Sequence, residues 1–277
     1  MPTVINTNTS AQLAQDALKV NSKTMSTAMQ QLATGNRINQ AKDDAAGLSI
    51  SQNMTSQVRG LNQAVRNIND GINLLQTADG ALVETSNMLQ RMRELAVQSS
   101  NATNSSSQRT YLNNEFVSLQ NEITRIATNT TWNNASVFGG TGGTANTMVF
   151  QAGINAGQSI SVSIASVDAG QLGVSASVVS IASYAGAQAS LALIDTAIDT
   201  VNNARSAMGA TMNQMNYSAD NMTNISTNIA ASRSSVMDTD YATASATLSK
   251  SQIVQQAATA MLAQANQQPQ SVLSLLK

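Results

Sequence analysis

Residues 54–89 read MTSQVRGLNQAVRNINDGINLLQTADGALVETSNML, and this stretch decides the fold. Its apolar side chains recur at alternating spacings of four and three residues and then at seven-residue steps: Met54, Val58, Leu61, Val65, Ile68, Ile72, Leu75, Leu82 and Leu89. That pattern is the a/d seam of a coiled coil, which needs partner helices to cover it. Asp79 and Ser86 interrupt one row, so we expect the packing to change there. A helix from about residue 44 to residue 98 spans roughly 80 Å at the rise of an α-helix, which indicates a rod.

A second heptad ladder lies near the other end of the chain. Its apolar residues follow one another at seven-residue intervals: Ile194, Val201, Met208, Met215, Met222, Ile229 and Val236. Arg205, Ser226 and Arg233 are polar exceptions in the companion row. The methionine row could suggest a thioether metal site, but heptad spacing favours a packed core. The two ladders have a similar reach, so we expect their helices to pair antiparallel.

Each end of the chain carries one more helical pattern. Ala11, Leu18, Met25 and Leu32 recur every seven residues and predict an amphipathic helix that ends near Gly35. The last helix is predicted to follow residues 238–241, and its apolar residues lie on more than one face: Leu248, Ile253, Val254, Ala257, Ala258, Met261, Leu262 and Ala265. One N-terminal helix cannot cover them all, so other subunits are expected to do so.

Shorter segments connect these helices. Residues 36–44 form a polar joint, in which the acidic pair Asp43–Asp44 could bind a cation but more simply caps the long helix. Residues 101–108 have the composition of a turn, and apolar spacing in residues 112–126 predicts a helix that folds back on the long one.

The helical period is lost between the two ladders. Ile160, Val162 and Ile164 alternate with serines, and with residues 148–150 they predict a hairpin or small sheet. Residues 167–186 are rich in Ala, Ser, Gly and Val. We interpret them as a connector, which is either a plain linker or a surface loop modified on its hydroxyl groups.

The composition excludes several classes of function. The net charge is −1 with 10% charged residues, so neither nucleic acid nor an anionic membrane is an expected partner. Cysteine and histidine are absent, which removes disulfides, thiol catalysis and the commonest metal ligand. No catalytic or phosphate-binding motif is present, and no apolar run approaches the ~20 residues of a membrane span. We therefore predict no enzyme activity, cofactor, metal site or membrane span.

Six motifs resemble those of bacterial flagellins. Towards the N-terminus they are LATGNRINQAKDDAAGL at 32–48, RNINDGI at 66–72 and LQRMRELAVQ at 89–98. FQAGIN at 150–155 is similar to the family's β-hairpin motif, and DTDYA at 238–242 and AQANQQPQSVLSLL at 263–276 are similar to its C-terminal pattern. The resemblance covers nearly everything outside residues 167–186.

The resemblance implies a mainly α fold, in which a long antiparallel coiled-coil or helical-bundle rod carries a small β-hairpin region and paired terminal helices. Residues 1–43 and 237–277 would be the inner coiled-coil helices. Residues 44–166, with the hairpin, and 187–236 would be the two parts of the rod. The short connector at 167–186 would replace the variable outer domains of many relatives.

As a flagellin, the chain would be exported and would polymerise into the extracellular flagellar filament used for swimming. Export would use the flagellar type III apparatus and a flagellin chaperone, and the filament cap and hook-associated proteins would be further partners. Assembly would bury apolar residues of the terminal helices: Leu18, Met25, Leu32, Val254, Met261, Leu262, Val272, Leu273, Leu275 and Leu276.

The family's contact with host Toll-like receptor 5 lies on the rod. The matched motifs transfer it to Gln90, Arg91, Leu95, Gln98 and Glu115. Two positions depart from the family pattern. Leu119 stands where receptor-activating members often carry an arginine, and Asn36 stands where many relatives have an apolar residue.

Other functions were weighed against this one. A hook–filament junction protein, or another secreted coiled-coil appendage subunit, would use a similar plan, but the motifs at 89–98 and 263–276 favour flagellin. A helical signalling module should bring a membrane span or a sensing domain. A flagellin with a hydrolase in its central region is excluded by the short connector and the absence of histidine.

Overall fold

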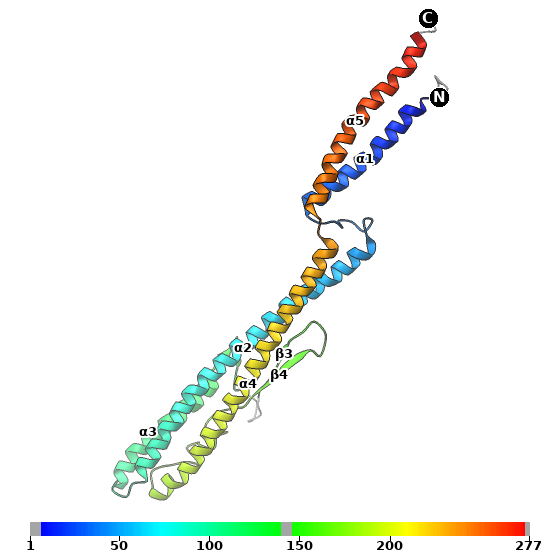
Figure 1. Cartoon of the computed structure of the whole chain (residues 1–277). Helices are drawn as coiled ribbons and strands as arrows, with labels where there is room; N and C mark the ends of the chain where they lie inside the picture. The colour runs from blue at the N-terminus through cyan, green and yellow to red at the C-terminus, as the bar shows by residue number, and fades with distance from the viewer. Residues whose placement is uncertain (1–6, 140–145, 275–277) are drawn as a thin grey trace. The chain divides into compact units, whose positions relative to one another are not determined.

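The computed structural model describes residues 7–139 and 146–274, with side chains up to residue 267. Its helices and strands follow in this order (Figure 1): α1 (Thr9–Thr34), α2 (Ala45–Ser99), α3 (Ser106–Asn129), β1 (Thr131–Trp132), β2 (Ala135–Ser136), β3 (Asn146–Gln151), β4 (Ser159–Ile164), α4 (Tyr184–Met237) and α5 (Tyr241–Ser274). The described residues divide into two compact units. We call residues up to 58 and from 227 onward the terminal unit, and residues 59–226 the central unit.

The terminal unit contains α1 and α5 packed side by side in opposite directions (Figure 1). The side-chain amide of Asn8 donates to the carbonyl of Ala265 at 2.9 Å, and Asn21 donates to the carbonyl of Ser251 at 2.7 Å. Asn8 also caps α1, because its side-chain oxygen accepts from the Ala11 N–H at 3.0 Å. The buried residues of the pair are small, which allows the two helices to approach closely: Ala11, Ala28, Ala244 and Ser251.

The joint after α1 and the joint before α5 are hydrogen-bonded to each other. Gly35 ends α1 in the left-handed conformation, with φ of 73°, which glycine adopts without a steric penalty. The N–H of Arg37 then donates to the carbonyl of Met237 at 2.7 Å, and the N–H of Thr239 donates to the carbonyl of Gly35 at 2.9 Å. The predicted end of the first helix is confirmed.

Of the acidic pair predicted to cap α2, Asp44 does so, whereas Asp43 binds the backbone of the joint before the helix. Asp44 Oδ1 accepts from the Gly47 N–H at 2.8 Å, and Asp43 Oδ2 accepts from the Gln40 N–H at 3.0 Å. The expected bound at 43/44 lies in the joint before α2 and that at 236/237 lies in the last turn of α4, whereas the division between the two compact units falls within α2 and α4.

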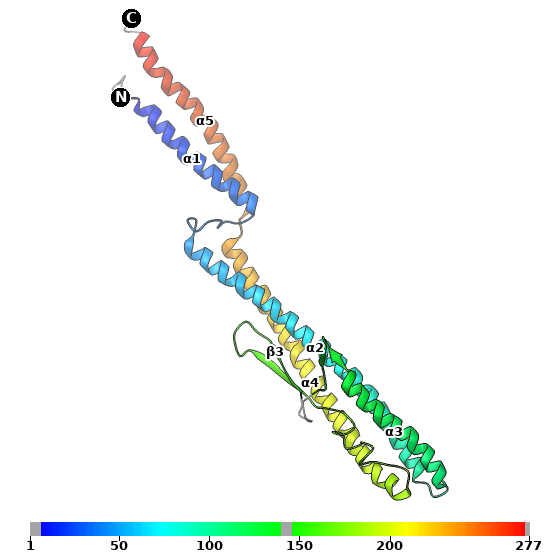
Figure 2. The same ribbon diagram turned by 180° about the vertical axis from the view of Figure 1, so that it is seen from behind.

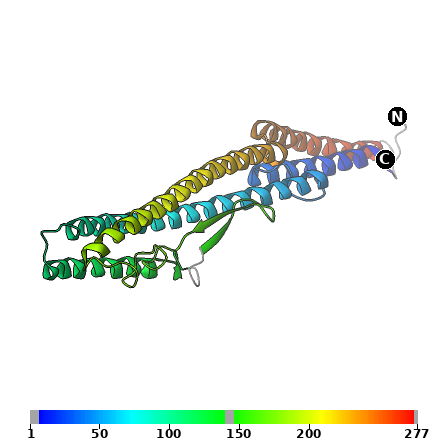
Figure 3. The same ribbon diagram turned by 90° about the horizontal axis from the view of Figure 1, so that it is seen from below.

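The core of the central unit is the seam between α2 and α4, which run side by side (Figure 3). Both predicted ladders are confirmed in this unit, where their apolar residues are buried: Leu61, Ile68, Ile72, Leu75, Leu82 and Leu89 on α2, with Ile194, Val201, Met208, Met215 and Met222 on α4. Aliphatic side chains of α2 therefore pack with aliphatic and thioether side chains of α4 in the interior.

Three polar contacts cross this seam, and the first joins two residues that interrupt the ladders, Asp79 and Arg205. Arg205 Nε donates to Asp79 Oδ1 at 2.7 Å. The hydroxyl of Ser226 lies 3.0 Å from Asn62 Oδ1. Arg93 Nε donates to Asp195 Oδ1 at 2.6 Å. Residues 62, 79 and 93 of α2 pair with residues 226, 205 and 195 of α4. The two helices are therefore antiparallel, and these contacts favour one register.

Helix α3 folds back beside α2 (Figure 2). It begins at a capping box: the Gln108 N–H donates to Ser105 Oγ at 3.3 Å, and the Ser105 N–H donates to Gln108 Oε1 at 2.8 Å. The predicted turn is therefore shorter than residues 101–108. The inner face of α3 buries Phe116, Gln120, Ile123 and Ala127.

The segment between β4 and α4 packs against α2 and α3 within the central unit. Gln120 Nε2 donates to the carbonyls of Val174, at 2.8 Å, and Val179, at 3.2 Å. Ser99 Oγ donates to the carbonyl of Ile181 at 2.6 Å. Six apolar side chains of the segment are buried: Val167, Ala169, Leu172, Val174, Val179 and Ile181. The interpretation of this segment as a plain linker is wrong, because its apolar residues form part of a core.

The predicted hairpin is also confirmed. Strands β3 and β4 pair antiparallel from Asn146 opposite Ile164 to Gln151 opposite Ser159, and β1 pairs with β2 in a second small sheet. Val162 and Ile164 are buried, while the serines between them are exposed.

Two glycines of α2 provide the surface on which this hairpin lies. A Cβ atom at Gly60 would lie 2.8 Å from Ile154 Cγ2, and one at Gly71 would lie 3.0 Å from Phe150 Cδ1. The two positions are about three helical turns apart, so they share one face of α2. Gly80 has no neighbour within 4 Å of such a Cβ.

We expect Gly80→Ala to raise the free energy of unfolding by about 1 kcal/mol, because alanine is the better helix former and the space is open. Gly71→Ala gains the same helix propensity, but its Cβ would press on Phe150 and on Met215 Cε, 3.2 Å away. We therefore expect Gly71→Ala to be less stable than Gly80→Ala by at least about 1 kcal/mol. Denaturant titration followed by circular dichroism measures both, and equal stabilisation would contradict the role of Gly71.

Candidate assembly and recognition surfaces

The predicted assembly residues fall into three groups. Leu18, Met25, Leu32 and Leu262 are half-buried, whereas Val254 is 40% exposed and Met261 is 67% exposed. Val272 and Leu273 lie on α5 where side chains are not described, and Leu275 and Leu276 lie outside the described residues.

Further apolar side chains of the same two helices are exposed. Leu13 is 73% exposed and Val20 is 66% exposed, and their seven-residue spacing puts them on one face of α1. The sequence could have indicated their exposure, because they are large apolar residues that lie outside the heptad seam. We call the exposed apolar residues of the terminal helices the assembly surface: Leu13, Val20, Met29, Ile253, Val254 and Met261. At about 100° per residue, Met29 lies on the opposite side of α1 from Leu13 and Val20, so these residues expose apolar area on more than one side of the helix pair.

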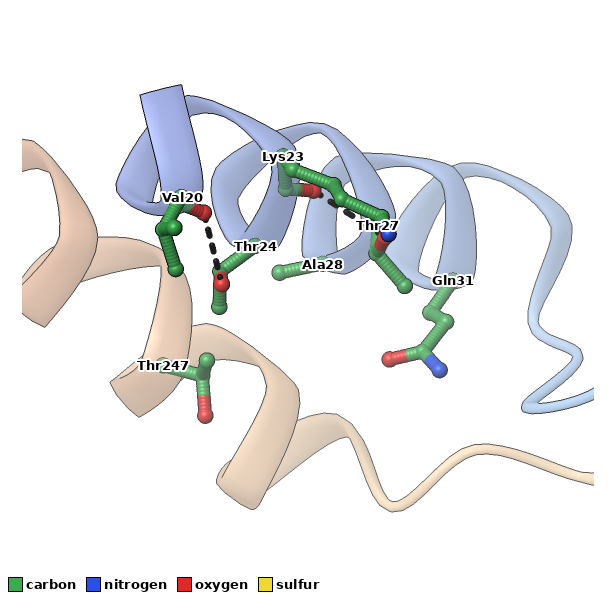
Figure 4. A pocket seen from close by; sticks show the side chains of 7 residues that line it. All are labelled: Val20, Lys23, Thr24, Thr27, Ala28, Gln31 and Thr247. Carbon is green, nitrogen blue, oxygen red and sulfur yellow. Dashed lines mark hydrogen bonds between the residues drawn. The ribbon is translucent and has the colours of Figure 1, made fainter. Parts of the chain in front are cut away.

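A shallow groove of about 390 Å³ runs beside this surface (Figure 4). Six of its lining residues come from α1 and one comes from α5: Val20, Lys23, Thr24, Thr27, Ala28, Gln31 and Thr247. Thr24 Oγ1 donates to the carbonyl of Val20 at 3.1 Å, and Thr27 Oγ1 donates to the carbonyl of Lys23 at 3.0 Å. Both hydroxyls therefore serve their own helix, and the groove presents mainly methyl and methylene groups.

The predicted receptor residues are brought together where α2 and α3 lie side by side. Arg91 joins the helices: its Nε donates to Glu115 Oε1 at 3.0 Å, and its Nη1 donates to Glu94 Oε2 at 2.9 Å. The hydrogen bonds to Glu94 and then to Glu115 raise the pKa of Arg91. Gln90 and Gln98 are exposed on the same helix. We call the exposed residues Gln90, Arg91, Gln98 and Glu115 the recognition patch.

Leu95 is the exception within the predicted set. Its side chain is 1% exposed, so it packs in the core of the central unit and offers no surface to a receptor. The sequence prediction missed Val97, which is 50% exposed and lines a groove of about 530 Å³ with Gln90, Arg93, Glu94 and Gln98. Residues 90, 94, 97 and 98 follow the spacing of one helix face, which could have indicated it.

An ionic contact at the edge of this groove joins α2 to α4. Arg93, on the edge of the groove, pairs with Asp195 of α4, and that hydrogen bond raises the pKa of Arg93. Among the described residues, no group of three or more acidic side chains is placed to hold a metal ion. None of the helices in the described ranges is long and apolar enough to cross a membrane.

These features define a class of protein: a coiled-coil subunit with a packed central unit and a terminal helix pair whose apolar surface is left for other molecules to cover. The family model of the bacterial flagellin N-terminal helical region matches residues 5–142, and that of the bacterial flagellin C-terminal helical region matches residues 191–276.

Individual proteins agree with the family models. A flagellin of Halalkalibacterium halodurans is 42% identical over 274 residues, covering 99% of this chain and all of the relative. Flagellin A of Vibrio cholerae is 34% identical over 378 aligned positions, covering 99% of each chain. The crystal structure of Bacillus cereus flagellin, 31% identical, covers 61% of this chain and 94% of that chain with a TM-score of 0.50.

The chain belongs to the bacterial flagellin family. It is a structural subunit of the extracellular flagellar filament and not an enzyme. A protein of Vibrio parahaemolyticus described as flagellar hook-associated shares the fold, with a TM-score of 0.59, but at 16% identity this likeness concerns the fold alone. The hook–filament junction alternative is therefore not favoured.

We expect Leu95→Ala to lower the free energy of unfolding by about 2–5 kcal/mol, because it removes buried contacts and leaves a cavity. Gln98→Ala, one helical turn further and exposed, is the matched control and should change stability by less than about 0.5 kcal/mol. Denaturant unfolding of both variants measures this difference. A Leu95→Ala protein as stable as the control would mean that Leu95 is not a core residue.

Proposed function

We propose that the chain polymerises by burying its assembly surface against other copies of itself. The observation that carries this proposal is the exposure of Leu13, Val20, Ile253 and Met261, which range from 66% to 73% exposed. Fully burying one such side chain contributes about 1.5–3 kcal/mol, so a few contacts repeated in every subunit can hold a filament together. The α1–α5 pair uses its seam internally and leaves these off-seam residues for neighbours.

The same surface gives the export partners something to bind. An exposed apolar face on a secreted subunit needs cover before assembly, because such faces aggregate. We infer that a flagellin chaperone covers the face of α5 that carries Ile253, Val254 and Met261, and that the flagellar export apparatus delivers the chain to the filament cap. Hook-associated proteins would meet the first and last subunits of the filament, which serves swimming.

The recognition patch is the candidate contact for host Toll-like receptor 5. Arg91 supports this proposal best, because its guanidinium is exposed and held by Glu94 and Glu115 from two helices. An arginine fixed in this way loses little conformational freedom when it binds, and arginines of this kind are common interface hot spots. Leu119 is half-buried on α3, close in sequence to Glu115.

We expect the double variant Leu13→Ser/Val20→Ser to lose seeded polymerisation, because each serine removes apolar area that assembly would bury. Gln12→Ser/Gln15→Ser changes two exposed polar residues of the same helix and should polymerise normally. Sedimentation and electron microscopy after seeding measure filament yield, and circular dichroism checks that both variants fold. Normal filaments from a folded Leu13→Ser/Val20→Ser protein would rule out this face.

We expect Arg91→Ala to lower Toll-like receptor 5 signalling at least about tenfold in a reporter-cell assay, as truncation of a hot-spot arginine does. The control is Arg125→Ala, which removes another exposed arginine paired on α3. Arg125 Nε donates to Glu122 Oε2 at 2.7 Å, and this contact lowers the pKa of Glu122.

A variant outside the recognition patch tests the departure at Leu119. Leu119→Arg restores the residue that receptor-activating members often carry, so we expect it to increase signalling. Equal responses of Arg91→Ala and Arg125→Ala would argue against the recognition patch, whatever Leu119→Arg does.

A further inference from the structure

We propose that Met29 and Met261 are oxidation sites, at which a peroxide converts the assembly surface from apolar to polar and so prevents the subunit from joining a filament. This inference rests on the proposed assembly surface, because both residues belong to it. It adds a chemical modification that controls the surface.

The first observation is the distribution of methionine exposure. The chain has thirteen methionines. Of the twelve in the described residues, Met29 is 49% exposed and Met261 is 67% exposed, and the others are half-buried or buried. The most deeply buried belong to the central unit: Met92, Met208, Met215 and Met222. An oxidant in solution therefore meets the thioethers of α1 and α5 before it meets those of the central core.

The second observation is that methionine is the only sulfur-containing residue of the chain. Cysteine is absent, so no thiol or disulfide competes for a mild oxidant or protects the protein from it. Peroxide chemistry on sulfur is thus confined to methionine, and exposure favours Met29 and Met261, which lie on the terminal helices.

The reaction is a two-electron oxidation in which the oxidant is hydrogen peroxide. The Sδ atom attacks one peroxide oxygen, the O–O bond breaks, an S–O bond forms and water leaves. Sulfur is oxidised to the sulfoxide and the peroxide is reduced. The product is a strong hydrogen-bond acceptor, and burying it against the apolar side chains of another copy without a donor is unfavourable.

Assembly should in turn protect these two residues. Once Met29 and Met261 lie between copies, solvent peroxide no longer reaches their sulfur atoms. The switch therefore acts on free subunits and spares finished filaments. We expect the central unit to stay folded during mild oxidation, because its described methionines are buried or half-buried.

The test treats the full-length monomer with hydrogen peroxide, maps sulfoxides by peptide mass spectrometry and measures seeded polymerisation. We expect Met29 and Met261 to oxidise at least about tenfold faster than Met92, Met208, Met215 and Met222. Polymerisation should be lost in step with oxidation at 29 and 261, with the circular dichroism signal retained. Methionine sulfoxide reductases A and B should then restore it. In filaments treated after assembly, both residues should oxidise at least about tenfold more slowly than in the monomer.

The control is the double variant Met29→Leu/Met261→Leu, which keeps the apolar volume and has no sulfur at either position. Treated with peroxide, it should polymerise as well as untreated protein. Loss of its polymerisation after treatment would place the effect at another methionine and overturn the proposal. So would normal assembly of the wild-type chain oxidised at both sites, or failure of the reductases to restore assembly. If the untreated double variant assembles poorly, the reductase rescue of wild-type protein decides the question.

These outcomes are separable from failure of the proposed assembly surface. If Leu13→Ser/Val20→Ser polymerises normally and filaments leave Met29 and Met261 fully reactive, the surface itself is wrong. If that double serine variant fails to assemble but oxidised wild-type chain assembles, the surface stands and the oxidation switch is wrong.

Discussion

The apolar seam between α2 and α4 is the constraint on which the rest of the molecule depends. It carries six buried aliphatic residues from one helix and five buried residues from the other. A seam of similar apolar side chains could slide by a heptad at little cost. Asp79–Arg205, Asn62–Ser226 and Arg93–Asp195 favour one register, because a shift would separate all three pairs. Polar contacts across the seam therefore add a specificity that similar apolar side chains do not supply.

The two compact units differ in where they place their large apolar side chains. The central unit closes on itself, with α3, the hairpin and the segment after β4 supplying the cover that two helices alone cannot. The terminal unit uses alanine and serine to bring α1 and α5 together and places its larger apolar residues outside the seam. A filament subunit needs both kinds of packing. The central unit has to be folded before assembly, whereas the terminal unit becomes more stable when assembly buries its exposed apolar residues.

Heptad periodicity predicted the helices well because it records which residues face a neighbouring helix. The limits of α2, the pairing with α4 and the cap at Asp44 all followed from local pattern. The contacts of residues 167–183 could not be predicted in this way, because they depend on Gln120 reaching two backbone carbonyls, which carry no side-chain signal. The roles of Gly60 and Gly71 could not be predicted from local pattern either, since the hairpin that lies against them is about eighty residues or more further along the chain. Leu95 failed as a surface residue for a related reason: a family motif conveys importance without telling whether a residue contacts a partner or supports those that do.

The hydrogen-bonded joint between residues 35–37 and 237–239 has a consequence for when the subunit becomes competent. Its two halves, like α1 and α5, are separated by some two hundred residues of chain, so both contacts close a very long loop. Helix α1 has no helix of its own chain to pack against until α5 has been synthesised. A truncated chain therefore carries α1 without its seam, and it cannot present α1 and α5 together. The contacts between α1 and α5 thus form only after synthesis of the chain has passed through α5.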